Sequence, residues 1–223
     1  MSRLDSRSQL TRLADFLFEC GMLRKTPRSG YQFLGSGGEN VAEHSFRTAV
    51  IGFVLAHMAG ASKERTAMLC LFHDLPEART GDFNYVNKVY NRCDPARALA
   101  DSLAGTGLEG AVLPLHDELE EAASTEAKLA HDADQLDLML NLKEESDLGN
   151  RYADKWLDAA KERLRTPQGQ ELGRVIMETD HTDWWFLGPD QSWWERKGGK
   201  RPSAAGKLGV PGALDAPEDG QDD

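Results

Sequence analysis

Apolar residues recur at every third or fourth position through most of the chain, which is the spacing of helices that bury one face. No alternating pattern lasts long enough to build a sheet. We therefore expect an all-α fold. A long helix begins at Ser124, with an apolar stripe of Ala127, Leu129, Ala130, Ala133, Leu136, Leu140 and Leu142. The other predicted helices cover 10–22, 39–60, 62–78, 94–103, 113–122, 150–165 and 168–180.

Capping and breaking residues separate the predicted helices. Gly60 follows one helix and Ser62 is the predicted N-cap of the next, while Pro167 divides the last two. Two polar segments, 24–40 and 79–91, lack a helical stripe and are predicted to be loops.

The sequence changes character after residue 180. Two Trp pairs flank a turn at Gly188–Pro189, namely Trp184, Trp185, Trp193 and Trp194. We interpret them as an irregular C-terminal arm that packs on the body or on a second subunit. The segment 197–223 is rich in Gly, Pro, Lys and Ser and ends in acidic residues, so we expect a flexible, disordered tail. The rest, 1–196, is long enough for a single domain.

The charge balance narrows the choice of partners. The chain has 26 basic and 37 acidic residues, a net charge of −11, and a pI near 5.0. Proteins that bind duplex nucleic acid or anionic membranes usually carry a basic face, so we expect neither partner here. A small anionic substrate is compatible with this chain only if local positive charge or a metal ion overrides the global field.

Three further features indicate a cytoplasmic protein. No apolar run approaches the roughly 18 residues of a membrane-spanning helix. The first ten residues contain no apolar segment typical of a secretory signal. The three cysteines (Cys20, Cys70 and Cys93) are widely spaced and form neither a CxxC pair nor a disulfide framework.

The candidate chemistry gathers around one His–Asp pair. His73 and Asp74 end an apolar helix, where an imidazole and a carboxylate are costly to bury unless each is paired or bound to a metal. Glu77 follows one turn later. His44 and Asp134 stand on two other predicted buried helices. An imidazole and carboxylate set suits a borderline divalent cation such as Mn, Fe, Co or Zn.

The remaining histidines have simpler interpretations. His116 precedes an acidic, solvated face. His57 is 13 residues from His44 and faces another side of its helix, so we assign it to packing or to the surface. His181 is interpreted as structural.

The motifs ENVAEHS, FHDLPEARTGD and ADQLDLML occur in this order along the chain. Together they resemble the HD-domain metal-dependent phosphohydrolases, and in particular their small 5′-deoxynucleotidase branch. The resemblance covers about residues 10–145, and extends more loosely to residue 180. It implies an HD-domain helical bundle with a metal-binding core at about 39–146.

The resemblance also implies a role for each matching residue. His44, His73, Asp74 and Asp134 match the four ligands of one divalent metal ion, which is Mn, Co, Fe, Zn or Mg. Asp134 is chosen over Asp132 because it matches the Ala-Asp-x-Leu pattern; His131 and Asp132 are then candidates for a second shell. Glu77 matches the acidic residue that handles the attacking water, and Asp82 matches the acid on the leaving-group side.

The resemblance further implies substrate contacts from the segment that precedes His44, where the family has an Arg and an aromatic residue. Arg28 is the candidate for the phosphate, since a guanidinium can hold two oxygens. Tyr31 stands where related sequences often carry Trp, a residue associated with selection for 2′-deoxyribose. This departure leaves the sugar preference open.

These residues predict a metal-dependent phosphomonoesterase that hydrolyses (deoxy)nucleoside 5′-monophosphates to nucleoside and phosphate. One alternative is an HD phosphohydrolase that acts on another phosphate ester or on a nucleoside triphosphate. Another is a non-catalytic, metal-stabilised regulatory module. The expected partner is a small nucleotide, and assembly as a homodimer or higher homo-oligomer stays open because relatives commonly self-associate.

Overall fold

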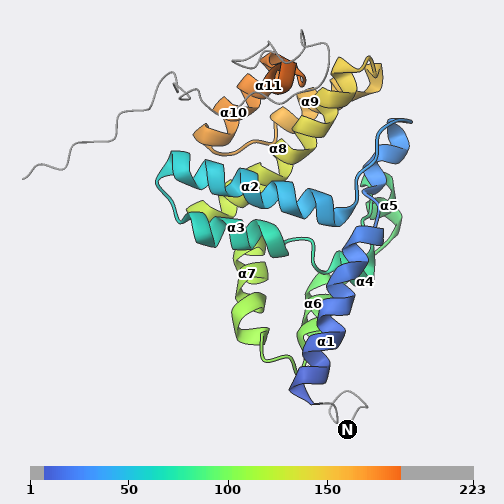
Figure 1. Ribbon diagram of the computed structural model, residues 1–223, viewed down its shortest axis with the longest axis vertical. Helices are drawn as coiled ribbons and strands as arrows, with labels where there is room; N and C mark the ends of the chain where they lie inside the picture. The colour runs from blue at the N-terminus through green and yellow to red at the C-terminus, as the bar shows by residue number, and fades with distance from the viewer. Residues whose placement is uncertain (1–7, 187–223) are drawn as a thin grey trace, which may run out of the picture. The chain divides into compact units, whose positions relative to one another are not determined.

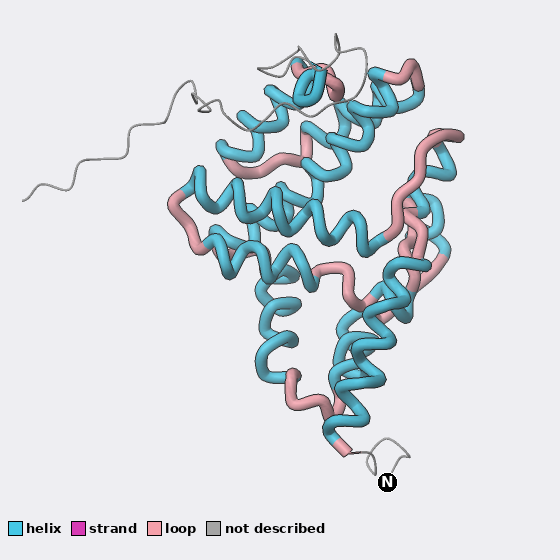
Figure 2. The backbone as a smooth tube through the Cα atoms, viewed as in Figure 1, coloured by secondary structure: helices cyan, strands magenta, loops and turns pink. Residues whose placement is uncertain are grey.

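The computed structural model describes residues 8–186, and within that range the chain is helical, as the pattern of apolar positions predicts (Figures 1 and 2). The elements in chain order are α1 (Gln9–Cys20), η1 (Gly21–Lys25), η2 (Ser29–Phe33), α2 (Val41–Ala59), α3 (Lys63–Phe72), α4 (Glu77–Thr80), α5 (Tyr85–Tyr90), α6 (Pro95–Leu103), α7 (Glu109–Glu121), α8 (Thr125–Asp147), α9 (Arg151–Lys161), α10 (Pro167–Glu178) and α11 (Asp183–Phe186). The two η elements are 3₁₀-helices. No helix in the described range has the length and apolar character needed to cross a membrane.

The chain divides into two compact units, Met1–His181 and Thr182–Asp223. The first unit contains every predicted site residue. The second contains α11, on which the side chain of Trp184 is 83 % exposed. Trp193, Trp194 and the predicted tail at 197–223 lie outside the described residues. A domain boundary at residue 196 stays a prediction.

The centre of the first unit is a stack of long helices. α2 lies beside α3 and packs against α8, which also contacts α9 and α10 (Figure 1). The main apolar core lies between these helices and includes Leu55, Leu69, Leu129 and Leu136, all fully buried. A second apolar cluster joins α1, α6 and α7. α2 and α8 are therefore rigid supports for any side chain that they carry inward.

Capping interactions define both ends of α2, of which only the end at Gly60 was predicted. The Asn40 side chain accepts a hydrogen bond from the Glu43 backbone N–H, and the Glu43 carboxylate accepts one from the Asn40 N–H. This reciprocal capping box satisfies two backbone donors at the helix start. The helix ends at Gly60, whose φ of 67° lies in the left-handed region that favours glycine.

The helix predicted over 62–78 was too long. α3 ends at Phe72, and a turn precedes the short helix α4. Pro76 has no N–H to donate to the Phe72 carbonyl, so the α-helical ladder stops there. Bonds three residues apart replace it, including one from the Leu75 N–H to the Phe72 carbonyl. The His73–Asp74 pair therefore lies at a bend rather than along a straight helix.

The two predicted loops also contain short helices. The segment 24–40 holds η2 and part of η1, and 79–91 holds α5. Asn84 caps α5 by accepting a hydrogen bond from the Asn87 N–H. α7 begins four residues earlier than predicted, at Glu109, and accommodates Pro114 inside the helix.

Candidate active site

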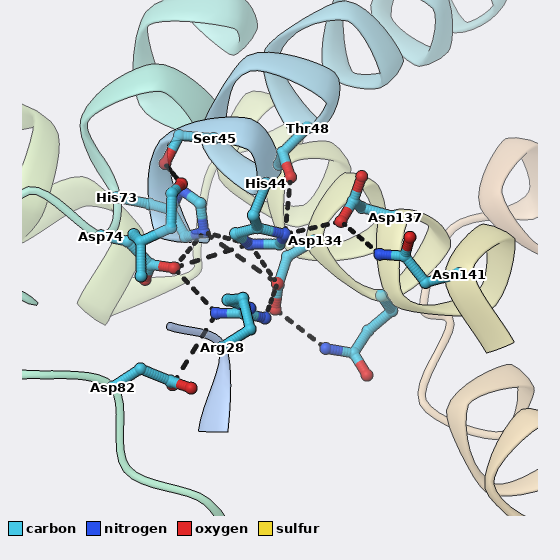
Figure 3. Close-up of polar contacts among 12 residues, drawn as sticks. Arg28, His44, Ser45, Thr48, His73, Asp74, Asp82, Asp134, Asp137 and Asn141 are labelled. Atoms are coloured by element: carbon cyan, nitrogen blue, oxygen red, sulfur yellow. Dashed lines mark hydrogen bonds and ion pairs between the residues drawn. The ribbon is translucent and has the colours of Figure 1, made fainter. Parts of the chain in front are cut away.

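The four predicted metal ligands converge from three separate elements of the chain (Figure 3). His44 comes from α2, His73 and Asp74 from the bend after α3, and Asp134 from α8. Nε2 of His44 lies 3.1 Å from Nε2 of His73 and 3.2 Å from Oδ1 of Asp134. Oδ2 of Asp74 lies 3.2 Å from Nε2 of His73 and 3.5 Å from Nε2 of His44.

The outer nitrogen of each imidazole has an acceptor that fixes the ring. Nδ1 of His44 lies 2.6 Å from Oδ2 of Asp137, and Nδ1 of His73 lies 2.6 Å from the carbonyl oxygen of Cys70. A carboxylate and a carbonyl accept hydrogen bonds, so each neutral imidazole carries its proton on Nδ1. Both Nε2 atoms then present lone pairs to the same point.

This donor set fits a divalent metal ion. The Nε2 atoms of the two imidazoles and an oxygen of Asp134 lie within 4.8 Å of one another, and Oδ2 of Asp74 lies beside both imidazoles, an arrangement that repels itself unless a cation lies among these atoms. Neighbouring donors of a metal with bonds of about 2.0–2.1 Å are separated by about 2.8–3.0 Å in octahedral geometry and about 3.3–3.4 Å in tetrahedral geometry. The separations of 3.1, 3.2, 3.2 and 3.5 Å are close to these ranges, and Nε2 of His73 lies farther, at 4.0 Å, from Oδ1 of Asp134.

Electrostatics within the cluster point the same way. Burial alone would lower the pKa of His44, but hydrogen bonds to Asp134 and Asp137 raise it to about 10. Burial alone would raise the pKa of Asp134, yet the contacts with His44 hold it well below its usual range. Carboxylates that hold a proton on an imidazole also attract a metal cation, which competes with that proton for the same nitrogen.

A second layer of polar residues supports His44. The Asp137 side chain is fully buried and also accepts hydrogen bonds from Nε of Arg47 and, at 3.5 Å, from Nδ2 of Asn141. Arg47 and Asn141 also contact the carboxylate of Glu39, at 3.5 and 3.1 Å. Sequence reasoning missed this network. Its signal was helical spacing, since Arg47 and Asp137 each follow a predicted ligand by three residues.

Arg28 lies over the carboxylates of the cluster. Its Nη1 donates to Oδ2 of Asp74 at 3.2 Å and lies 3.8 Å from Oδ1 of Asp82, and its Nη2 lies 3.9 Å from Oδ1 of Asp134. The backbone N–H of Arg28 donates to the Glu39 carbonyl at 2.9 Å, which anchors the segment before η2 to the start of α2. Arg28, from a segment that the sequence predicted only to be a loop, thus lies beside the predicted metal ligands.

Glu77 is half-buried beside the cluster, and its buried Oε2 atom has no hydrogen-bond partner among the described residues. Burial, with Asp74 and Asp82 nearby, raises the pKa of this carboxyl to about 9. An unpartnered buried oxygen of this kind is unusual in folded proteins. It is available to a water molecule or to a substrate.

Asp82 has a different environment. Its Oδ2 accepts hydrogen bonds from the backbone N–H and the hydroxyl of Ser29, at 2.5 and 2.9 Å. Oδ1 is left on the side of Arg28. Asp82 therefore fastens η2 to the loop after α4, in addition to any chemical role.

A cleft of about 250 Å³ opens beside these residues. Its lining includes Arg28, Gly30, Tyr31, Leu34, Glu39, Asp74, Glu77, Asp82, Phe83, Asn84, Tyr85, Lys88, Asp134, Gln135, Leu138, Asn141, Leu142, Trp156 and Arg163. Tyr31 lines the cleft, and its contact with a substrate stays a prediction. The volume is close to the lower end of the range typical of small-molecule sites, about 300–1,000 Å³.

Two residues suggested as a second shell lie elsewhere. His131 contacts the carbonyl of Leu119 at 3.3 Å, on the side of α8 that faces α7. Asp132 accepts hydrogen bonds from the backbone N–H groups of Arg165 and Thr166 and from the Thr166 hydroxyl, at the start of α10. Two residues along a helix are about 200° apart, so Asp132 faces away from Asp134. That prediction was wrong.

The other histidines match their simpler interpretations. His57 is exposed near the end of α2. His181 binds Asp147 through its backbone N–H and through Nδ1, at 3.0 and 3.3 Å.

Comparison with known proteins identifies the family. The HD domain family model matches residues 20–175. The 5′-deoxynucleotidase HDDC2 of Bos taurus is 30 % identical over 147 residues, which cover 62 % of this chain and 70 % of that protein. The human 5′-deoxynucleotidase HDDC2 is 28 % identical over 145 residues, covering 62 % and 71 %.

Solved structures agree with this assignment. The protein from the predicted coding region AF1432 of Archaeoglobus fulgidus is 31 % identical, with a TM-score of 0.54 over 78 % of this chain and 99 % of that one. The convergent imidazoles and carboxylates, the helical core around them and the extent of the family match lead to one conclusion. The chain belongs to the HD domain family and is a metal-dependent phosphohydrolase.

Proposed function

We propose that this protein hydrolyses nucleoside 5′-monophosphates, including deoxy forms, to the nucleoside and inorganic phosphate. The observation that carries the proposal is a single cleft lined by Asp74 and Asp134 of the donor cluster, by Arg28 and by Glu77, whose Oε2 has no hydrogen-bond partner among the described residues. Relatives named 5′-deoxynucleotidase support the substrate class.

His44, His73, Asp74 and Asp134 would hold one divalent ion. Such an ion lowers the pKa of bound water and polarises a phosphoryl oxygen. Two imidazoles and two carboxylates favour a borderline transition metal, namely Mn, Fe, Co or Zn, over Mg, which prefers oxygen ligands.

Arg28 binds the phosphate. One of its N–H groups donates to Asp74, and the planar fork has five donors in all. The ion pairs with Asp82 and Asp134 hold the guanidinium beside the metal-ligand cluster, where its remaining N–H groups can bind the phosphate. A bidentate guanidinium contact orients a phosphomonoester more strictly than a Lys ammonium does.

Glu77 accepts the proton of the attacking water. Its Oε2 is buried and without a partner, and the raised pKa makes the ionised carboxylate a stronger base than an ordinary Glu. The water oxygen forms a bond to phosphorus while the bond from phosphorus to the 5′ oxygen breaks. The departing 5′ oxygen takes a proton from the protonated form of Asp82, whose Oδ1 faces Arg28, and solvent returns that proton to Asp82 after turnover.

The test is phosphate release by the purified protein loaded with Mn²⁺, Co²⁺ or Zn²⁺, against ribo- and deoxyribonucleoside 5′-monophosphates and triphosphates. We expect orthophosphate from monophosphates. His44→Ala should abolish release, because it removes one donor of the cluster, whereas His57→Ala on the same helix should leave it unchanged.

The outcomes separate the alternatives. Tripolyphosphate or pyrophosphate released from triphosphates, with monophosphates left intact, would indicate a nucleoside triphosphate hydrolase. Metal binding without release from any phosphate ester would indicate a regulatory module. Rates on matched ribo- and deoxyribonucleotides determine the sugar preference that Tyr31 leaves open.

A further inference from the structure

Three cleft residues, Tyr85, Trp156 and Arg163, form a wall that the hydrolytic chemistry does not use. Arg163 lies over the Tyr85 ring, with its guanidinium carbon 5.0 Å from the ring centroid, and also contacts the Tyr85 hydroxyl. The rings of Tyr85 and Trp156 meet edge to face, with centroids 5.9 Å apart and planes at 61°. Two aromatic rings and a guanidinium thus form one continuous surface.

The wall packs against η2, the 3₁₀-helix that also contacts Asp82. Trp156 packs so closely on Gly30 that a Cβ atom there would lie 3.0 Å from Cη2 of the indole. The Phe33 ring contacts Trp156 edge to face, with centroids 6.3 Å apart. Gly30 and Phe33 belong to η2, the element that Asp82 fastens through Ser29.

A single side chain connects the wall to the metal-ligand cluster. Nε2 of Gln135 donates to Oδ2 of Asp134 at 2.9 Å, and Oε1 of Gln135 accepts from Nη1 of Arg163 at 3.4 Å. The anion-binding end of the cleft and the aromatic wall are therefore one side chain apart. In a nucleotide, one sugar separates the phosphate from the base.

Packing alone does not account for the wall. The main role of buried aromatics is to fill the core, yet Tyr85 is 46 % exposed and Arg163 is exposed as well. Both line the cleft. Exposed aromatic faces and arginine planes are the surfaces on which proteins stack nucleobases.

We propose that Tyr85, Trp156 and Arg163 bind the nucleobase of the substrate by stacking. The inference rests on the proposed function and extends it to the substrate class: a nucleotide is preferred over a base-free sugar phosphate. Every nucleobase has a π-face, so a stacking wall tolerates all of them. The wall discriminates weakly among bases and strongly between a base and none.

The experiment compares deoxyribonucleoside 5′-monophosphates with 2-deoxyribose 5-phosphate on the metal-loaded enzyme. Tyr85→Ala should raise KM for each nucleotide by about 5- to 160-fold, the range expected for one lost stacking contact, with kcat within about twofold of wild type. KM for the base-free ester should stay unchanged. Tyr85→Phe keeps the ring and should restore the nucleotide KM.

Tyr90→Ala is the matched control, because Tyr90 lies on the same short helix, is 82 % exposed and is absent from the cleft lining. An equal effect of Tyr85→Ala on the nucleotides and on the base-free ester, or an effect no larger than that of Tyr90→Ala, overturns the inference and leaves the proposed function intact. If the wild type releases no phosphate from any monophosphate, the proposed function fails. Titration with deoxyadenosine then tests the wall directly, and equal affinity of wild type and Tyr85→Ala overturns it.

Discussion

Asp137→Asn is predicted to weaken metal binding although Asp137 is not one of the predicted ligands. The Asp137 carboxylate accepts from Nδ1 of His44 with one oxygen and from Nε of Arg47 with the other. An asparagine has a single oxygen and must direct its NH₂ group at one of these two donors. If NH₂ faces His44, the imidazole is pushed toward the tautomer that carries its proton on Nε2 and cannot ligate there. If NH₂ faces Arg47, two donors oppose each other in a buried site.

The magnitude follows from the position of Asp137 behind a ligand. Removal of a carboxylate that orients a metal-bound imidazole typically lowers metal affinity about 10- to 100-fold. That corresponds to about 1.4–2.8 kcal/mol of binding free energy. The lost charge-assisted hydrogen bonds also lower the free energy of unfolding, by about 1.5–3 kcal/mol each. Metal affinity must therefore be measured under conditions in which each variant is folded.

Asp132→Asn is the matched control. Asp132 is on the same helix, is also fully buried, and accepts hydrogen bonds from Arg165 and Thr166. The Asp132→Asn substitution should reduce the thermal stability of the metal-free protein and leave the metal affinity near that of wild type. The assay is competition for Zn²⁺ or Mn²⁺ against a chromogenic chelator, with thermal unfolding of each metal-free protein. Equal metal affinity for Asp137→Asn and wild type, or an equal loss in Asp132→Asn, would refute the reasoning.

Three further predictions follow from the packing and charges of the fold. Gly52→Ala should lower stability by about 1–3 kcal/mol in denaturant titration, because its Cβ would lie 2.5 Å from Sγ of Cys70, whereas Gly110→Ala, which meets open space, should not destabilise. Glu19→Gln should destabilise the protein at neutral pH, because the hydrogen bond from Arg79 lowers the pKa of Glu19. The ionised Glu19 therefore stabilises the fold at pH values above its unfolded-state pKa near 4.5, and this stabilisation is lost as the pH falls through its folded-state pKa. The melting temperatures of Glu19→Gln and wild type should therefore converge in acid; a constant difference would contradict this. Chelation should lower the melting temperature of the metal-loaded protein. The loss of stability is about 2.7 kcal/mol if the free metal concentration was 100 times Kd. An unchanged melting temperature would argue against a metal ion bound by the metal-ligand cluster.

The apolar pattern drew attention to the candidate ligands, and the family resemblance then selected the set of four. His44, His73 and Asp134 each interrupt a buried stretch, and a polar group there needs a partner. Asp137 interrupts the same pattern but was not selected, since an acid-rich helix has several carboxylates and periodicity alone does not say which one meets α2. Only the packing of α8 against α2 makes that distinction.

Boundaries were predicted least well where a tertiary contact decides the local conformation. The segments 24–40 and 79–91 have no continuous apolar stripe, so their short helices had no periodic signal. They are joined to each other by Ser29 and Asp82 and by the hydrogen bond from Asn84 to Gln32. These contacts link residues more than 50 positions apart in sequence, and helical periodicity carries no information at that distance.

The acidic character of the chain bears directly on how it binds a phosphate. The cleft is lined by five acidic and three basic side chains, a formal charge of −2, which by itself opposes a phosphate dianion. A divalent cation among His44, His73, Asp74 and Asp134 brings that charge to zero. Arg28 then meets a phosphate that is attracted rather than repelled. In such a site the metal ion is a condition for substrate binding as well as for the chemical step, so an acid-rich surface and an anionic substrate are compatible in one protein.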